Sequence, residues 1–279
     1  MIPSVTAARR RTASVVVNLV LAAIGLVFLA PLLWLLTAAF DADAPLAARP
    51  PRELTLDNFA RVLTWDVSLG PVLNGLLMCG GAALVAVSAA VLCAYPLSRY
   101  QLRFRRPFLY AVLFASGLPM TAVMVPVYSM FVRLHLIDSM AGTALFLAAT
   151  SLPIAIWMTK NFMDGVPIAL EEAAWVDGAS GMQALRRIVL PLVLPGLSVV
   201  AIFTFITAWG NFYVPFVLLL DPAKQPASVG VYTFFGQGGL IAYGELAAYS
   251  LVYTAPVVLL YLLVSRTLGG AFALSGAIK

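Results

Sequence analysis

The chain has 279 residues, of which 62% are hydrophobic and 10% are charged. Soluble domains are about 45–50% apolar and about 25% charged, so this composition excludes an ordinary soluble protein and requires lipid around many side chains. The formal net charge of +5 does not indicate nucleic-acid binding, because Lys and Arg stand at the ends of apolar runs and form no basic patch. The even spread of these runs favours a single integral-membrane domain over 1–279.

Six apolar runs are each long enough to cross a bilayer as a helix. In chain order they cover about 14–40, 71–97, 108–131, 142–162, 191–220 and 244–264. Gly117, Pro119 and Pro126 interrupt the third run, and Pro31 is expected to kink the first. Between the first two runs, several prolines predict an irregular segment that contains one short amphipathic helix at about 55–63. The sequence therefore predicts an all-α integral membrane protein with six transmembrane helices.

Positive charge is distributed unevenly between the two sets of connecting segments. Twelve of the seventeen Lys and Arg residues lie in the N-terminus, 98–107, 160–190 and 266–279, and five lie in the other set. Because cytoplasmic links of membrane proteins carry an excess of Lys and Arg, we expect both termini and 160–190 on the cytoplasmic side.

The link at 163–190 is the acidic part of that cytoplasmic set. Pro167 suits the first position of a helix and Gly178 the residue just beyond its end, which predicts a helix over about Ile168–Asp177. Ser180 is expected to cap a second short helix that stops at Pro191. The alternative interpretation is an ordinary surface hairpin between two spans. A rigid helix–glycine–helix link is better suited than a flexible hairpin to binding a partner.

The side chains of the first of these two helices suit a protein partner. Its two glutamates lie in the first turns, where the helix dipole favours negative charge. Its alanines keep one face thin, and its tryptophan is of the type enriched in binding hot spots. The residues expected to couple the chain to its partner are Glu171, Glu172, Ala173, Ala174, Trp175, Asp177 and Gly178.

Seven residues of 163–191 resemble the EAA motif of type I ABC-transporter permeases. That motif reads E-A-A, three residues, G, about nine residues and then I-x-L-P. The matching residues are Glu172, Ala173, Ala174, Gly178, Ile188, Leu190 and Pro191. We call 163–190 the EAA segment.

The resemblance implies the ABC type-1 transmembrane fold, with a core unit at about 70–266 and a cytoplasmic coupling helix between spans 4 and 5. In that family the coupling helix sits in a cleft on an ATPase subunit, and ATP binding rocks the bundle from inward-open to outward-open. The implied partners are a second homologous permease subunit, two ATPase subunits, which hold the ATP and Mg, and an extracytoplasmic solute-binding protein. The implied location is a bacterial-type cytoplasmic (inner) membrane.

Two further stretches are similar to carbohydrate-uptake permeases. Trp209–Pro215 resembles their A-W-N-E-F segment, although Asn211 stands where that family usually has an acid. The ending Gly270–Lys279 resembles their G-x-x-x-G-A-x-K tail. The whole is most similar to the second permease of maltose-type systems, which implies transport of a sugar or a sugar derivative.

Polar and aromatic residues inside the apolar runs are candidates for a translocation path, because polar groups at membrane depth are costly. An aromatic ring and an amide suit a sugar through stacking and hydrogen bonds. The substrate-path candidates are Asn211, Trp209, Tyr213, Asn74, Tyr128 and Thr150. Two alternatives stay open: Trp209 and Tyr213 as interfacial aromatic-belt residues, and Asn211 as a hydrogen bond between helices.

Motifs for chemistry within this chain are missing. No G-x-x-x-x-G-K-[ST] occurs, so ATP must be bound by another subunit. The single histidine, His135, does not support a histidine-based metal site or triad, and we expect no metal, no cofactor and no enzyme activity. Two other functions remain as alternatives, an ion-coupled secondary transporter and a membrane glycosyltransferase that uses Asp41 and Asp43.

Overall fold

The computed structural model describes residues 4–47, 49–235 and 241–276, with side chains described for 14–47, 49–235 and 241–266. Two compact units are distinguished by their internal contacts, Met1–Thr64 with Phe234–Val252, and Trp65–Thr233 with Tyr253–Lys279. The basic side chains of Arg9, Arg10 and Arg11 lie outside the described side chains, and the end of the sugar-permease tail, 277–279, lies outside the described residues. The single domain over 1–279 and the core unit at 70–266 stay predictions.

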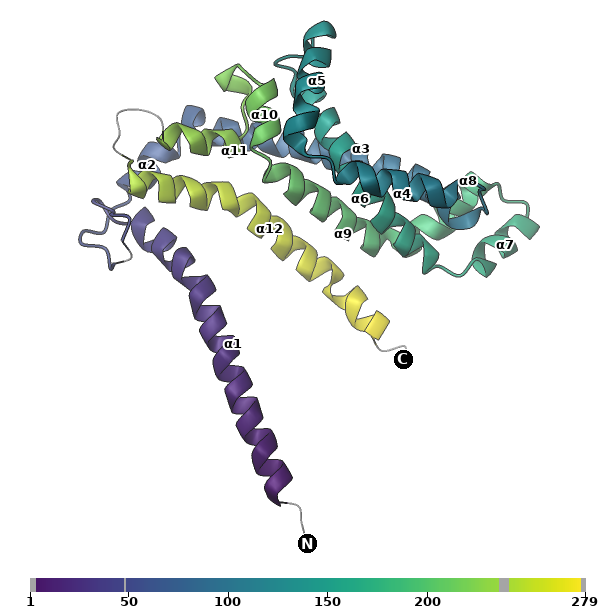
Figure 1. The fold of residues 1–279 in the computed structure, drawn as a ribbon, viewed down its shortest axis with the longest axis horizontal. Coiled ribbons are helices and arrows are strands. Elements are labelled where there is room, and N and C mark those ends of the chain that lie inside the picture. The colour runs from purple at the N-terminus through teal and green to yellow at the C-terminus, as the bar shows by residue number, and fades with distance from the viewer. Residues whose placement is uncertain (1–3, 48, 236–240, 277–279) are drawn as a thin grey trace. The chain divides into compact units, whose positions relative to one another are not determined.

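The described chain is helical almost throughout (Figure 1). Five helical segments are long and apolar enough to cross a membrane, and a bent pair makes a sixth if it counts as one span. The five are Ser14–Ala39, Trp65–Arg99, Met140–Asp164, Gly181–Trp209 and Tyr243–Arg266. The prediction of a multi-pass, all-α membrane protein is confirmed.

The bent pair consists of α4 (Arg105–Ser116) and α5 (Met120–Arg133), which meet at 94°. The break falls at Gly117–Pro119, as the sequence predicted, because proline cannot donate the backbone hydrogen bond that would continue the helix. The other predicted interruption is wrong, since α5 continues through Pro126.

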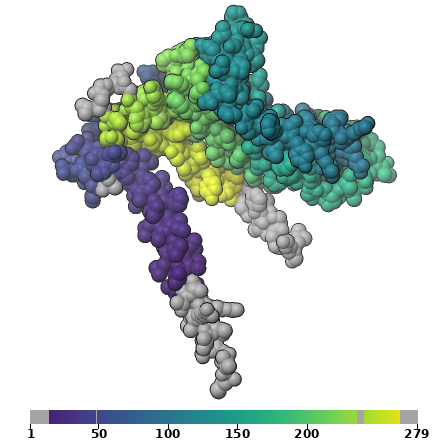
Figure 2. Space-filling model, in the orientation of Figure 1, coloured from purple at the N-terminus to yellow at the C-terminus, as the bar shows by residue number. Residues whose placement is uncertain are grey.

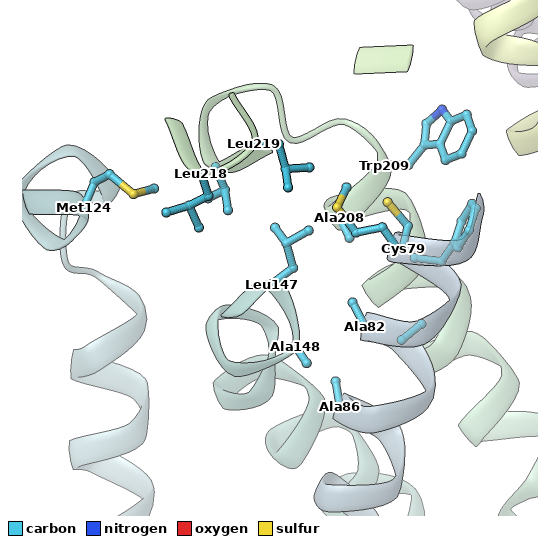
Figure 3. Packing of buried hydrophobic residues seen from close by; sticks show 14 of the residues in the cluster. Cys79, Ala82, Ala86, Met124, Leu147, Ala148, Ala208, Trp209, Leu218 and Leu219 are labelled. Carbon is cyan, nitrogen blue, oxygen red and sulfur yellow. The ribbon is translucent and has the colours of Figure 1, made fainter. Parts of the chain in front are cut away.

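The core of the second unit is formed by α3 (Gly70–Arg99), α6 (Met140–Asp164) and α9 (Leu190–Trp209), which pack on one another. Ala82 and Ala86 of α3 are buried where they face Leu147 and Ala148 of α6 (Figure 3). Small side chains let helix backbones approach closely, which is the main source of helix association in lipid. Alanines of the second apolar run thus form part of its packing face against α6.

The fifth apolar run does not form one helix to Leu220, and that prediction is wrong. The helix ends at Trp209, with Gly210 as its C-terminal cap, and α10 (Tyr213–Leu218) follows after a break. The chain continues through a 3-10 turn (Pro222–Lys224), α11 (Ala227–Gly230) and a 3-10 segment (Val231–Phe235). The last helix is α12 (Tyr243–Gly276).

The first unit contains α1 (Ser4–Ala39), which runs through Pro31 without ending, and the short α2 (Asp57–Val62). Most of the described α1 side chains from Ser14 to Leu36 are exposed and apolar, a pattern that fits contact with lipid. The buried amide of Asn58 donates to the carbonyls of Ala39 at 3.2 Å and Asp41 at 2.9 Å. These bonds fix α2 to the end of α1, and the predicted short helix is confirmed.

Candidate functional site

The first helix that lies wholly within the EAA segment is α7 (Ala169–Val176), which falls within the predicted helix Ile168–Asp177. The helix ends at Gly178, whose φ of 87° is in the left-handed region. Glycine adopts this conformation without the steric cost of a Cβ atom, and it commonly ends helices in this way. The predicted helix and its glycine stop are both confirmed.

The second helix of the segment begins at Ser180. The Ser180 hydroxyl accepts from the Gln183 amide at 3.3 Å, and the Gln183 side chain accepts from the Ser180 amide at 2.7 Å, which forms a capping box. This helix does not stop at Pro191, and that prediction is wrong. It continues from α8 (Gly181–Ala184) through a π-helical turn (Leu185–Val189) into α9.

The π-helical turn explains how the helix accommodates the proline. A proline ring inside an α-helix clashes with the carbonyl four residues earlier. A π turn widens the helix locally, and such turns occur mostly as single insertions within α-helices. As a result, a single helical segment of 29 residues connects the EAA segment to the far end of the membrane bundle.

Glu171 is fully buried against residues of α3. Its carboxylate forms an ion pair with Arg99 and accepts a hydrogen bond from the Tyr95 hydroxyl at 2.8 Å. The Arg99 guanidinium also donates to the carbonyl of Val166 at 3.2 Å. These contacts fix α7 to the end of α3, and a direct contact of Glu171 with a partner stays a prediction.

A second ionic contact lies beside this pair. Lys160 and Asp164 form an ion pair at the end of α6, and the Ser98 hydroxyl donates to Asp164 at 2.6 Å. Since Ser98 is next to Arg99, the ends of α3 and α6 and the start of the EAA segment are held by one connected set of polar contacts.

The face of α7 opposite Glu171 is exposed. Glu172, Ala173 and Asp177 are exposed, and Val176 has 88% of its surface accessible. Two more apolar side chains, Ile168 at 42% and Leu170 at 45%, extend this surface. Ala174 and Trp175 are half-buried. Exposed apolar residues next to charged ones are typical of protein interaction sites.

Sequence reasoning missed the α3 half of this site. The sequence places Tyr95, Ser98 and Arg99 only in the second span and the basic link after it. The one available signal was charge, because Arg99 and the acidic EAA segment were both predicted on the same side of the membrane.

Figure 1 shows α7 and α8 at one end of the second unit and α10 and α11 at the other. We call Trp209–Ser228 the far-end segment. Trp209 is buried and stacks on Phe205 and Tyr253, with ring centroids 5.5 Å apart in both pairs. Its indole donates to the Tyr253 carbonyl at 3.2 Å, and the Tyr253 hydroxyl donates to the Trp209 carbonyl at 2.8 Å. This tryptophan is a packing residue in the structure.

The two asparagines proposed for the substrate path also hold backbone atoms. The Asn211 carbonyl oxygen Oδ1 accepts from the Val214 amide at 3.0 Å, near the start of α10. The Asn74 side-chain amide donates to the carbonyls of Ala223 at 2.8 Å and Gln225 at 3.3 Å. Both side chains therefore fix the path of the chain after α9.

The remaining substrate-path candidates form fewer contacts with distant parts of the chain. The Thr150 hydroxyl donates to the Leu147 carbonyl within its own helix at 2.9 Å. Tyr213 is half-buried against the core of α3, α6 and α9, and Tyr128 on α5 is 38% exposed. The part of all six candidates in a substrate path stays a prediction.

Asp41 and Asp43, the glycosyltransferase candidates, belong to a folded turn. Asp41 is 2% exposed and pairs with Arg49 at 3.4 Å. The same guanidinium donates to the Asp43 carbonyl at 2.6 Å. Among the described residues, no group of three or more His, Cys, Asp or Glu is placed to hold a metal ion. The geometry therefore gives Asp41 a structural role.

Comparison with known proteins agrees with this architecture. The chain is 33% identical over 229 residues to the protein ORF1 of Streptomyces antibioticus, covering 82% of this chain and 99% of that protein. It is 28% identical to the diacetylchitobiose uptake system permease protein NgcG of Streptomyces coelicolor, covering 88% of this chain and 82% of that one. It is also 28% identical to the trehalose/maltose transport system permease protein MalG of Thermococcus litoralis, covering 91% and 92%.

Solved structures show the same fold. A chain from a bacterial ABC transporter involved in alginate import superposes with a TM-score of 0.79 at 21% identity, over 92% of this chain and 96% of that one. A chain of the MetNI methionine ABC transporter gives 0.58 at 21% identity, over 73% and 95%. Residues 84–269 match the family model described as binding-protein-dependent transport system inner membrane component. The chain belongs to this family of ABC-transporter permeases.

Proposed function

We propose that the chain is one permease subunit of an ATP-driven importer for a sugar or a sugar derivative, and that α7 is its coupling helix. The observation that carries the proposal is the division of α7 into two faces. One face holds Glu171, buried on Arg99, and the other exposes Glu172, Val176 and Asp177. A helix fixed on one side and open on the other suits the transmission of movement from a partner.

The transmission of movement follows from the connections of α7. Movement of its exposed face would reach α3 through the Arg99–Glu171 pair, because both side chains are buried and closely held. It would reach α9 through Gly178 and the unbroken helix that begins at Gly181. The membrane bundle would then alternate between inward-open and outward-open states.

The energy for this movement is supplied by other subunits. Permeases of this family are not enzymes themselves, and we assign ATP and Mg to two ATPase subunits. A second homologous permease would complete the path, and an extracytoplasmic solute-binding protein would deliver the substrate. One of the similar structures is a bacterial alginate transporter in complex with a periplasmic protein that holds an alginate pentasaccharide.

The substrate class rests on relatives and on the resemblance of Trp209–Pro215. Relatives carry names for diacetylchitobiose, trehalose and maltose transport, and we extend carbohydrate transport to this chain. The EAA segment and both termini are assigned to the cytoplasm of a bacterial-type inner membrane, in keeping with the excess of Lys and Arg on that side.

Two variants that each add one cysteine test the sidedness and the contact. Val176→Cys places a thiol on the open face of α7, and Leu220→Cys, at a position 56% exposed, places one in the far-end segment. A membrane-impermeant maleimide should label Val176→Cys only in inside-out vesicles and Leu220→Cys only in right-side-out vesicles. The unaltered chain, with Cys79 and Cys93, serves as the background control.

The assembled complex supplies the second readout. A short thiol-to-amine cross-linker on Val176→Cys should capture an ATPase subunit, whereas Leu220→Cys should not. Labelling of Val176→Cys from the outside, or cross-linking to the solute-binding protein alone, would contradict the proposal.

A further inference from the structure

A cleft of about 340 Å³ lies between α4 and α6. Its lining residues are Arg105, Arg106, Leu109, Tyr110 and Trp157. The volume is within the ~300–1,000 Å³ of small-molecule pockets. The combination of two guanidinium groups with two aromatic rings sets the cleft apart from the apolar groove lined by α3 and α6 residues such as Leu77 and Leu145.

The positive charge in the cleft is not balanced by the described protein. The ion pairs among the described residues involve neither Arg105 nor Arg106. Arg105 is half-buried and Arg106 is exposed. Two adjacent guanidinium groups without an acidic partner repel each other, so an anion that contacts both would be favoured.

The cleft lies near the end of the second unit that carries the EAA segment. Arg105 follows α3 by only a few residues, and the last residue of α3, Arg99, pairs with Glu171. Trp157 precedes Asp164, the last residue of α6, by about two helical turns, or roughly 10 Å. In the space-filling view, teal residues of α4 and α5 form part of the visible surface of this unit (Figure 2).

The exposure of the two aromatic side chains that line the cleft indicates where the cleft lies relative to the membrane surface. Tyr110 is 66% exposed and Trp157 is 38% exposed. Trp and Tyr are enriched where a membrane meets water, because their rings suit the level of the lipid headgroups. Leu109 supplies an apolar wall beside them.

We propose that this cleft binds the phosphodiester headgroup of an anionic phospholipid. The planar guanidinium groups of Arg105 and Arg106 match the geometry of phosphate oxygens. Basic pockets between transmembrane helices on the cytoplasmic side are known to hold such headgroups. A free phosphate shares the charge chemistry, but it would make no use of Tyr110, Trp157 and Leu109. The lipid is therefore the occupant that uses the whole lining.

The test uses the complete transporter with its partner subunits, reconstituted in phosphatidylcholine with or without phosphatidylglycerol. Phosphatidylglycerol that remains bound after transfer to detergent is counted by native mass spectrometry. Arg105→Gln and Arg106→Gln should each retain about fivefold less of this lipid than the unaltered complex, as expected for one lost arginine contact. Arg103→Gln is the matched control, because Arg103 is an exposed arginine nearby in the chain that does not line the cleft.

Each outcome decides the proposal. Wild-type retention in Arg105→Gln and Arg106→Gln, or an equal loss in Arg103→Gln, would overturn it in favour of general surface charge. Displacement of the lipid by inorganic phosphate or glycerol phosphate would assign the cleft to a free anion instead. If a variant does not assemble, photoactivatable phosphatidylglycerol is cross-linked to the unaltered complex. Adducts on α4 and near Trp157 support the site, and adducts confined to other helices overturn it.

Discussion

At one end of α9, the polar side chains of the EAA segment pair with polar side chains of α3; at the other end, polar side chains bind backbone atoms. Glu171 is held by Arg99 and Tyr95, whereas Asn211 and Asn74 hold the amide of Val214 and the carbonyls of Ala223 and Gln225. The first arrangement fixes two helices to each other. The second fixes the path of a loop.

This difference bears on function because α7 leaves acidic side chains exposed, where a partner can contact them. On α7, one glutamate is used internally and its neighbour, Glu172, is exposed. In the far-end segment, the indole of Trp209 and the carbonyl oxygen of Asn211 are already bonded within the chain. Polar residues in apolar runs thus serve first to hold the fold, and exposure distinguishes the residues that remain available.

The largest effect should come from Glu171→Gln. The change leaves the buried Arg99 guanidinium without its counter-charge, and breaking a buried ion pair costs about 3–5 kcal/mol. We expect a large drop in the melting temperature of the purified complex and loss of ATP-driven uptake. Glu172→Gln is the matched control one residue away and should change stability by less than about 0.5 kcal/mol, as at other exposed sites.

The two glutamate variants distinguish a residue that holds α7 on α3 from a residue that contacts the ATPase subunit. Glu172→Gln should weaken attachment of the ATPase subunit, measured by co-purification, while its melting temperature stays unchanged. Equal stability loss in both variants would show that the two faces of α7 are not distinct.

Most of the helices could be predicted from the sequence because their signals are local. Apolar runs, Pro119 and the left-handed Gly178 each act within a few residues of the chain. The roles of Glu171 and Asn74 could not, because their partners are distant in sequence: 72 residues separate Arg99 from Glu171, and 149 separate Asn74 from Ala223. An acid or amide in a membrane protein has the same sequence signature whether it binds a partner, a substrate or its own backbone.

Gly178→Ala should have the next largest effect. A Cβ atom at this position meets nothing within 4 Å, so the cost comes only from the left-handed φ of 87°. That cost is roughly 1–2 kcal/mol for an L-residue, and it should reduce the coupling of ATP hydrolysis to uptake. Gly178→Asn should recover part of the loss, since asparagine adopts this conformation more readily.

Gly80→Ala is the control for that experiment. Gly80 lies inside α3, and a Cβ there also meets nothing within 4 Å. Alanine in place of a mid-helix glycine should stabilise by up to about 1 kcal/mol. A loss of coupling in Gly80→Ala equal to that in Gly178→Ala would remove the special role of the helix stop.

Asn211→Ala tests the far-end segment. Loss of the side-chain acceptor near the start of α10 should cost about 1 kcal/mol and impair uptake through the displaced loop. Asn211→Ser and Asn211→Asp keep an acceptor and should restore both stability and uptake. If uptake stays low in both while stability recovers, Asn211 contacts the substrate directly and the comparison between the two ends must be revised.

The smallest effect is expected within α9, at Thr204→Val. The Thr204 hydroxyl is buried in α9 without a hydrogen-bond partner among the described residues. Replacing an unsatisfied buried hydroxyl with a methyl group of similar shape should be neutral or stabilise by about 1 kcal/mol. Thr207→Val is the control, because the Thr207 hydroxyl is exposed and donates to the Phe203 carbonyl at 2.8 Å. Lower uptake in Thr204→Val with unchanged melting temperature would instead place this hydroxyl on the translocation path.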